Sequence, residues 1–471
     1  MVGTDGFAKP VTLKGVQVLP PVLGFLSDPL RTADRVSKTH GDFVILRFPF
    51  AVGRMPRTVV YTAMAPHFRE ILGDPASWRT VNILAAGRGG HASSRLSRGL
   101  VRMRGDRHGH YRRLVTPRLR RASVSAMGES LGSEAERICE SWPRDRTVDL
   151  YALCRNMMQQ LAAGHLFGSG EEQACAIARM ISSFVSASWS LPINLFHLDL
   201  PGMPYRRFLR LAEDLEERIL EWAETKQGGL DPTDLLSIVV NNPDENGRRP
   251  ENSLIVGHVP TLFGAAYETC QNALTWLLIL LSQHPRIEGA LCEEITAAVG
   301  GRALTLERVE GLQFLDSVVK EGLRILPPVP NQYRVATRDA HLGGVSVARG
   351  TRAILSAFMR NRDPDFYEAA DRFLPERWEN LEPSPFEYAV FSAGPRSCPG
   401  FGFGSSVLKL ALAAILSRHR VVIEEQAEIG YRVTVALTPY PGVPARLAAR
   451  GTSVGMSEIR GPIRRLVSFP T

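Results

Sequence analysis

The stretch from Phe391 to Gly404, FSAGPRSCPGFGFG, is the most informative part of the sequence. It sets one cysteine, Cys398, among glycines and prolines, directly before an apolar segment that predicts a helix beginning near Ser405. Backbone N–H groups of a glycine-rich turn and the positive end of a following helix both lower the pKa of a thiol. Arg396 is suited to pairing with a carboxylate through its planar guanidinium. The alternative interpretation is a turn that happens to contain a buried cysteine.

Two other glycine patterns have simpler explanations. The glycines after Cys398 have the spacing of a dinucleotide-binding turn, but that turn requires a preceding hydrophobic strand, and Pro395 and Pro399 stand in its place. Residues 451–455 spell G-x-S-x-G, the nucleophile elbow of hydrolases, which needs an acid and then a histidine downstream. No histidine or aspartate follows Ser453. We therefore predict neither a nucleotide site nor a hydrolase.

Composition is that of a globular protein, with 44% hydrophobic and 22% charged residues among 471. The formal net charge is +8, but the basic residues are spread along the chain and show no interleaving with aromatics. That distribution argues against nucleic-acid binding. Without linkers or repeats, we predict a single catalytic domain over residues 1–450 and a tail of unknown role over residues 451–471.

The six cysteines lie far apart and include no C-x-x-C pair, which favours a reducing compartment. Pro20 and Pro21 interrupt the only apolar candidate for a signal peptide or anchor near the start. The densest apolar run, Ala273 to Leu281, is well short of the roughly 20 residues that span a bilayer. We therefore expect a cytoplasmic protein, monomeric and without a membrane anchor.

Periodicity predicts a mainly α protein with a small β-rich lobe. Apolar residues recur at helical spacing in Ser130–Trp142, Tyr205–Glu224, Leu254–Ser282 and Ser405–Arg418. Short alternating pieces rich in valine, isoleucine and threonine predict strands at Asp42–Phe48, Thr58–Tyr61, His341–Val347, Ala353–Leu355 and Tyr431–Leu437.

The cysteine stretch resembles the F-x-x-G-x-R-x-C-x-G signature of cytochrome P450 enzymes, the haem-thiolate monooxygenases. Phe391, Gly394, Arg396, Cys398 and Gly400 occupy its five fixed positions. The resemblance implies a cytochrome P450 fold of the soluble bacterial type. It also implies that Cys398 is the axial ligand of haem iron, that Arg396 pairs with a haem propionate, and that Phe391 packs near the sulfur. Gly400 belongs to the same cofactor-binding loop.

A second resemblance involves three charged residues. Glu321 and Arg324 have the spacing E-x-x-R, and Arg377 follows in PERW at about the distance that the family requires. The spacing alone has little value, because surface helices contain it constantly. The resemblance implies a buried structural triad that braces the haem-binding core, since buried charges are tolerated only when all are paired.

The stretch from Phe263 to Cys270, FGAAYETC, lies in the longest apolar segment and places an acid, Glu268, beside a hydroxyl, Thr269. It resembles the family's A-G-x-[DE]-T motif, with Ala266 in place of the usual glycine. The resemblance implies that Glu268 and Thr269 are catalytic and deliver protons while dioxygen is activated. The alternative is a helix-packing contact with a polar pair turned to solvent. Pro260 in the same segment is expected to bend the helix.

Further cofactor and substrate contacts follow only from the resemblance. It implies that His108, Arg112 and Arg334 contact the haem propionates, although exposed basic residues on a helix are the ordinary alternative. A mostly apolar substrate pocket is predicted from eight residues. These residues are Ile83, Leu84, Phe184, Leu191, Phe263, Ala265, Val329 and Thr438.

The resemblance implies an oxidoreductase of secondary metabolism that contains haem b and inserts one oxygen atom of dioxygen into a lipophilic small molecule by hydroxylation or epoxidation. Terpenoid, fatty-acid, steroid and polyketide-like substrates stay open. Electrons are expected from NAD(P)H through a separate ferredoxin or flavodoxin and its reductase. The alternatives are a haem-thiolate peroxygenase or a non-redox rearranging enzyme, and a non-catalytic haem sensor or carrier. The pairing of Glu268 with Thr269 weighs against all of these.

Overall fold

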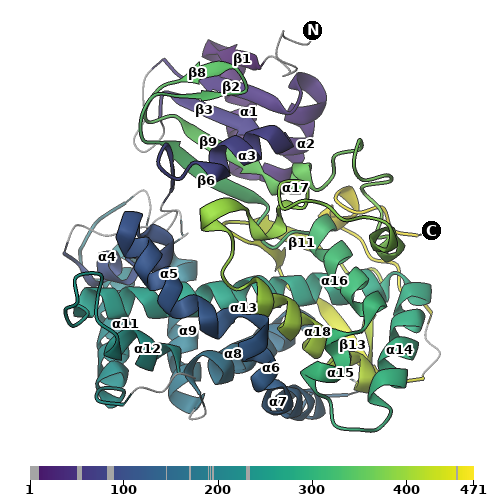
Figure 1. Cartoon of the computed structure of the whole chain (residues 1–471). Coiled ribbons are helices and arrows are strands. Elements are labelled where there is room, and N and C mark those ends of the chain that lie inside the picture. Colours follow the sequence, from purple (N-terminus) through teal and green to yellow (C-terminus); the bar gives the residue numbers. More distant parts are fainter. Residues whose placement is uncertain are drawn as a thin grey trace.

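The computed structural model describes residues 10–49, 56–81, 90–144, 146–168, 171–188, 190, 193, 196–229, 234–451 and 455–470. Within them the chain forms a sheet-rich lobe and a larger helical lobe, the upper and lower parts of Figure 1. This arrangement confirms the predicted mainly α protein with a small β component.

The upper lobe is built on one six-stranded sheet. In order across the sheet its strands are β1 (Val11–Lys14), β2 (Phe43–Arg47), β3 (Thr58–Thr62), β9 (Arg352–Ser356), β6 (Asn331–Ala336) and β4 (Trp78–Thr80). Four of the five residues of β2 are buried, which shows that this apolar strand is packed on both of its faces. The sheet joins strands from the start of the chain with β6 and β9, which follow α16 in the sequence.

Nine helices of at least 13 residues form most of the lower lobe in the part of the chain that the structure describes. They are α5 (Gly105–Leu119), α7 (Gly128–Glu140), α8 (Leu150–Phe167), α9 (Glu171–Ser188), α11 (Pro204–Thr225), α13 (Asn252–Ser282), α14 (Pro285–Val299), α16 (Gln313–Ile325) and α18 (Phe401–Arg418). The 31-residue α13 runs across the lobe and packs against α8, α9, α11, α16 and α18 (Figure 1). It continues through Pro260.

Shorter helices connect these elements. They are α1 (Leu19–Ser27), α2 (Pro29–His40), α3 (Ala65–Gly73), α4 (Ala92–Leu96), α6 (Arg121–Ala126), α12 (Leu235–Asn241), α15 (Leu306–Glu310) and α17 (Ala357–Arg360). Six 3₁₀ turns accompany them among the described residues, at Gly15–Val18, Leu100–Arg102, Pro375–Glu379, Ala389–Phe391, Gly394–Arg396 and Pro462–Arg465.

Two predicted strands are hairpins. Residues 341–347 fold as β7 (Ala340–Leu342) and β8 (Val345–Val347), because Gly343 and Gly344 both adopt positive φ and reverse the chain. The predicted strand over residues 431–437 is split into β11 (Gly430–Val433) and β12 (Leu437–Tyr440). A three-stranded sheet of β10 (His419–Ile423), β13 (Pro444–Ala449) and β5 (Val148–Asp149) completes the fold.

Helix α18 begins at Phe401, four residues before the predicted start near Ser405. Tertiary packing outweighs the low helix propensity of its glycines. A Cβ on Gly402 would lie 2.6 Å from the backbone nitrogen of Arg121, so only glycine lets this turn contact the junction between α5 and α6. In length and composition α18 is apolar enough to cross a membrane, yet 72% of it is buried inside the protein, as in a core helix.

The described residues of the tail pack on the helical lobe. Ile459, Ile463 and Val467 are buried in the main core. The guanidinium of the half-buried Arg362 donates to the carbonyl of Leu466 at 3.0 Å. Ser468 binds Asp371 through both its backbone N–H and its hydroxyl. The tail therefore contributes apolar packing and a backbone acceptor to the core, while its role in function stays a prediction.

Candidate active site

The loop that carries Cys398 is closed by its own backbone. The N–H of Cys398 donates to the carbonyl of Phe391 at 2.8 Å, which folds the intervening residues into a compact turn. Gly394 within it has φ of +68°, and a Cβ there would lie 2.4 Å from the carbonyl oxygen of Leu72 on α3. Glycine is therefore required at this position both for the backbone conformation and for the close contact with the sheet-rich lobe.

Cys398 lies in the turn that leads into α18. The residue is exposed, yet burial by the surrounding protein raises the pKa of the thiol, and the Gly400 N–H and the Arg112 guanidinium only partly oppose that rise. The sequence prediction of a lowered pKa is therefore wrong for the free protein, because desolvation outweighs the turn and the helix end. The Cys398 sulfur is accessible and is contacted by a backbone N–H. Helix α18 begins three residues after Cys398.

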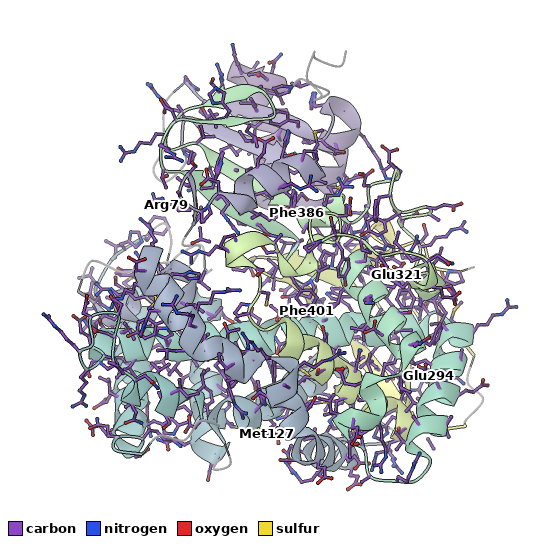
Figure 2. The ribbon with its side chains drawn as sticks, in the orientation of Figure 1. Arg79, Met127, Glu294, Glu321, Phe386 and Phe401 are labelled. Carbon is purple, nitrogen blue, oxygen red and sulfur yellow. The ribbon has the colours of Figure 1, made fainter. Side chains whose placement is uncertain are left out.

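Two phenylalanines connect this loop to the protein surface. The rings of Phe391 and Phe401 meet edge to face with centroids 4.8 Å apart, and Phe401 is 55% exposed. Figure 2 places Phe401 near the middle of the molecule. Both line a groove of about 850 Å³ whose walls come from the α5–α6 junction, α16, the segment 378–388 and the start of α18. Arg120, Arg121 and Lys320 bring positive charge to this groove, and Asp316 and Glu382 bring negative charge.

The residues predicted to contact propionates come together. Arg112 Nη2 donates to the hydroxyl of Ser397 at 3.2 Å, and Arg396 Nη2 donates to the carbonyl of Met103 at 2.6 Å. Arg334 on β6 is only 7% exposed, and burial together with the nearby Arg396 lowers its pKa to about 10. Burial, Arg396 and Arg112 lower the pKa of His108 to about 4.

This cationic cluster, defined as His108, Arg112, Arg334 and Arg396, has no acid of its own. Among the described residues, no carboxylate forms an ion pair with any of these three arginines. Mutual repulsion lowers the pKa of Arg396 as well, after the effect of burial. Buried like charges are unfavourable unless an anion pairs with them. The cluster is therefore suited to a ligand that carries carboxylates.

The predicted acid and hydroxyl lie in the middle of α13, where that buried helix becomes accessible. Ala265 is exposed, whereas Phe263 and Gly264 just before it are buried. The hydroxyl of Thr269 donates to the carbonyl of Ala265 at 2.8 Å. Burial raises the pKa of Glu268 to about 7, so this carboxyl is partly protonated at neutral pH. An acid that titrates near neutrality is suited to proton transfer.

The packing of α13 on α18 brings this region near Cys398. A Cβ on Gly404 would lie 3.7 Å from the sulfur of Cys270, the residue that follows Thr269. Cys398 also contributes to the raised pKa of Cys270, after burial and with the hydroxyl of Thr269 opposing it. This packing supports the prediction that the acid–alcohol pair and the thiol share one site.

Glu321, Arg324 and Arg377 form a fully paired buried network. Arg324 donates two hydrogen bonds to the Glu321 carboxylate in a bidentate pair, at 2.9 and 2.8 Å, and Arg377 Nε donates to the same carboxylate at 3.0 Å. The indole of Trp378 and the N–H of Leu374 donate to the same carboxylate, each at 3.0 Å. Although burial alone would raise it, these donors hold the pKa of Glu321 below its usual value. Figure 2 shows Glu321 to the right of Phe401.

The predicted substrate contacts are only partly described. Ile83, Leu84 and Leu191 lie outside the described residues. Phe184 and Phe263 are buried in the core, where Phe184 stacks on Phe208 at 5.3 Å and Phe263 packs against Phe167. Val329 is half-buried, and the hydroxyl of Thr438 accepts a hydrogen bond from Asn272 at 3.3 Å. Their contact with a substrate stays a prediction.

Sequence reasoning missed polar residues beside Glu268. Gln271, one turn further along α13, donates to the hydroxyl of Tyr151 on α8 at 2.9 Å. Nothing in the sequence connects two residues 120 positions apart, so no local signal was available to find this pair.

The chain matches the family model described as "Cytochrome P450" over residues 32–442. It is 29% identical to pentalenene oxygenase of Streptomyces avermitilis over 75% of this chain and 80% of that protein. It is 28% identical to cyclooctatin synthase of Streptomyces melanosporofaciens, covering 85% of this chain and 88% of that protein. From the same organism, cyclooctat-9-en-7-ol 5-monooxygenase is 26% identical over 81% and 83% of the two chains.

Solved structures show the same fold. "Retinoic acid bound cyanobacterial CYP120A1" superposes with a TM-score of 0.79 at 20% identity, covering 94% of this chain and 99% of that one. A structure titled "Crystal structure of cytochrome P450DA heme domain" gives 0.76 at 20% identity, covering 94% and 98%.

Proposed function

Because the chain belongs to the cytochrome P450 family, we propose that it oxygenates a cyclic terpenoid, with electrons from NAD(P)H delivered by a separate ferredoxin or flavodoxin. The chain is a haem-thiolate monooxygenase that acts on a lipophilic small molecule, as the family and its bacterial relatives indicate. Three points are proposals: that the substrate is a terpenoid, that a ferredoxin or flavodoxin carries the electrons, and that the enzyme is cytoplasmic and monomeric.

The single observation that supports this proposal most strongly is the cationic cluster beside an accessible thiol. The residues fit haem b, because Cys398 offers a sulfur donor, while Arg112, Arg334 and Arg396 offer charge for two propionates. When bound there, haem would supply the iron at which dioxygen is activated. The propionates would also supply the anions that the cluster lacks within the described chain.

The residues of α13 would then control protons and exclude water. Glu268, with its pKa near 7, can hold or release a proton under neutral conditions. Thr269 keeps its hydroxyl on the helix through the carbonyl of Ala265, which places the hydroxyl oxygen next to the exposed part of α13. The small side chains of Ala265 and Ala266 leave space over this part of the helix for a flat cofactor and a bulky apolar substrate.

The terpenoid proposal is supported by the relatives' names. Three bacterial relatives are named for pentalenene, cyclooctatin and cyclooctat-9-en-7-ol, and each is matched over most of its length. A fused-ring hydrocarbon offers few polar groups, which agrees with a site approached through alanines and other apolar side chains.

We propose that the redox carrier docks in the groove beside Phe401. The groove lies against the Cys398 loop, and Phe401 in turn contacts Phe391 within that loop. Arg120 is exposed at its wall and favours an acidic partner, whereas Arg121 is also exposed but pairs with Glu310. A short path through two aromatic rings would connect the carrier to the thiolate side of the cofactor.

A binding and turnover experiment tests the proposal. The haem-loaded protein is titrated with cyclic terpene hydrocarbons and, in parallel, with fatty acids and steroids, and the haem absorption spectrum is followed. We expect terpenes to shift the spectrum and to yield products heavier by one oxygen atom with NADH, ferredoxin and reductase. A response to fatty acids or steroids but not terpenes contradicts the substrate class. Product formation with peroxide alone favours the peroxygenase.

A further inference from the structure

The polar residues next to Glu268 connect the middle of α13 to α8. Gln271 is 3% exposed and lies one turn after Glu268, so the two side chains share a helix face. Its amide nitrogen donates to the hydroxyl of Tyr151 at 2.9 Å, whereas its carbonyl oxygen is buried with no hydrogen-bond partner among the described residues. Buried polar atoms are nearly always satisfied, so this oxygen is placed to accept a proton donor or a water.

Glu268, one turn earlier on the same helix face, can supply that donor. Burial raises the pKa of its carboxyl to about 7, so a large fraction is neutral and carries an O–H near pH 7. Its proximity also contributes, after burial, to raising the pKa of Tyr151 to about 12 and the pKa of Tyr267 above its usual value. The charged groups facing this region are Glu268 itself, Arg155, which is exposed on α8, and Asp149, which precedes α8 and also raises the pKa of Tyr151.

The two tyrosines near Glu268 differ in what their hydroxyls do. The hydroxyl of Tyr267 is bonded to Ser182 on α9, which also accepts from Gln159 at 3.1 Å. The hydroxyl of Tyr151 accepts from Gln271, and its own proton is donated to none of the residues that the structure describes. Tyr151 is also half-buried in the first turn of α8, so it lies between solvent and the interior.

We propose that Tyr151 and Gln271 form the entry of a proton path to Glu268. This inference rests on the proposed oxygenase function, in which protons are consumed at the site. The hydroxyl proton of Tyr151 moves, through a water, to the Glu268 carboxylate, and the phenolic oxygen takes a proton from solvent in the same event. No net charge is left on the tyrosine. Gln271 holds the phenol in place and accepts the O–H of neutral Glu268 through its carbonyl oxygen.

Paired variants of the haem-loaded enzyme test the role of Tyr151. With ferredoxin, reductase and NADH but no added substrate, the rate of NADH consumption is compared in H2O and D2O for wild type, Tyr151→Phe and Tyr267→Phe. Because positioned acids contribute about 10²-fold or more, we expect Tyr151→Phe to slow turnover by about 10-fold while a bypass through water persists, and to enlarge the isotope effect. Tyr267→Phe, the matched control, leaves the isotope effect unchanged. Equal isotope effects in both variants overturn the proposal.

An infrared titration tests Gln271 without relying on turnover. The C=O band of neutral Glu268, assigned by its loss in Glu268→Gln, is followed against pH in wild type and in Gln271→Leu. We expect a midpoint near pH 7 in wild type and a lower one in Gln271→Leu, because the neutral carboxyl loses its acceptor. An unchanged midpoint contradicts the role of Gln271. If no terpene is oxygenated but the infrared and isotope results are as expected, the substrate proposal is wrong and the proposed proton path is supported. If even wild type consumes no NADH, the infrared result alone decides.

Discussion

The network around Glu321 and the cationic cluster around Arg396 both contain buried or half-buried arginines, but among the described residues only the first contains its own carboxylate. In the network, Glu321 accepts from two guanidinium groups, an indole and a backbone N–H, and Arg324 also donates to three backbone carbonyls. In the cluster, the carbonyl of Tyr333, at 3.0 Å, is the only hydrogen-bond acceptor of Arg334 among the described residues.

This difference separates two uses of buried charge. Charges that are paired within the chain fix its conformation, because removal of one partner leaves the other desolvated and alone. Charges of one sign that are left without a partner destabilise the empty protein and favour a ligand of the opposite sign. The network is therefore complete in the chain alone, whereas the cluster is suited to an anionic ligand such as the proposed haem b.

The largest expected effect follows from breaking the network. Glu321→Gln leaves two buried guanidinium groups without their carboxylate and should lower the free energy of unfolding by about 3–5 kcal/mol. Urea unfolding of the haem-free protein, followed by circular dichroism, measures this loss. Glu379→Gln changes an exposed carboxylate on the neighbouring turn and should shift the free energy by less than about 0.5 kcal/mol. A loss of under about 1 kcal/mol in Glu321→Gln contradicts the bracing role.

The cluster should respond in the opposite direction when it loses a charge. Arg334→Met removes one of the mutually repelling cations, so the haem-free protein should unfold at equal or slightly higher urea concentration. Haem retention should weaken by about 10- to 100-fold, since a charge-assisted hydrogen bond contributes roughly 1.5–3 kcal/mol. Haem transfer to an excess of apomyoglobin measures the second effect.

A nearby exposed arginine provides the control for this pair of measurements. The side chain of Arg338 is 66% exposed, and Arg338→Met should change neither quantity appreciably. If Arg334→Met destabilises the haem-free protein as strongly as Glu321→Gln does, the proposed difference between the network and the cationic cluster is wrong.

The smallest expected effect is a pH dependence at His108. Its folded pKa of about 4 lies below the unfolded value of roughly 6.5, so the unfolded state binds more protons between these limits. This contribution to stability is complete above about pH 6.5 and is lost as the pH falls toward 4. Discounted for partial exposure, it amounts to about 1 kcal/mol.

A difference measurement isolates this contribution, because the buried His165 and His258 have pKa values lowered in the same direction. The change in unfolding free energy between pH 7 and pH 5 should be smaller in His108→Gln than in wild type, whereas the exposed His341→Gln should match wild type. Bound haem should reduce the difference, because its carboxylates would raise the pKa of His108. If bound haem does not change this difference between wild type and His108→Gln, His108 does not act as a member of the cationic cluster.

The sequence located most of the elements but not all of their ends. The long apolar segment of α13 was predicted within two residues, because its 3.6-residue periodicity extends over many turns. The start of α18 was predicted four residues late, because glycines next to Cys398 predict a turn, and only their packing on the α5–α6 junction makes them helical. The hairpins at β7–β8 and β11–β12 were each predicted as a single strand, because the turn between the two strands depends on backbone conformation that the alternating pattern does not indicate.

The sequence by itself determined the candidate functional groups, which are a cysteine in a fixed glycine-rich pattern and an acid beside a hydroxyl, and it also contained the two members of the structural E-x-x-R pair. These patterns are local, so each can be read without knowing what else lies nearby. Only the tertiary structure decided which charges are paired and which are not, why the pKa of Cys398 rises, and that Tyr151 meets Gln271 from 120 positions away. Burial and partnership depend on distances between segments remote in sequence, and those distances exist only once the chain has folded.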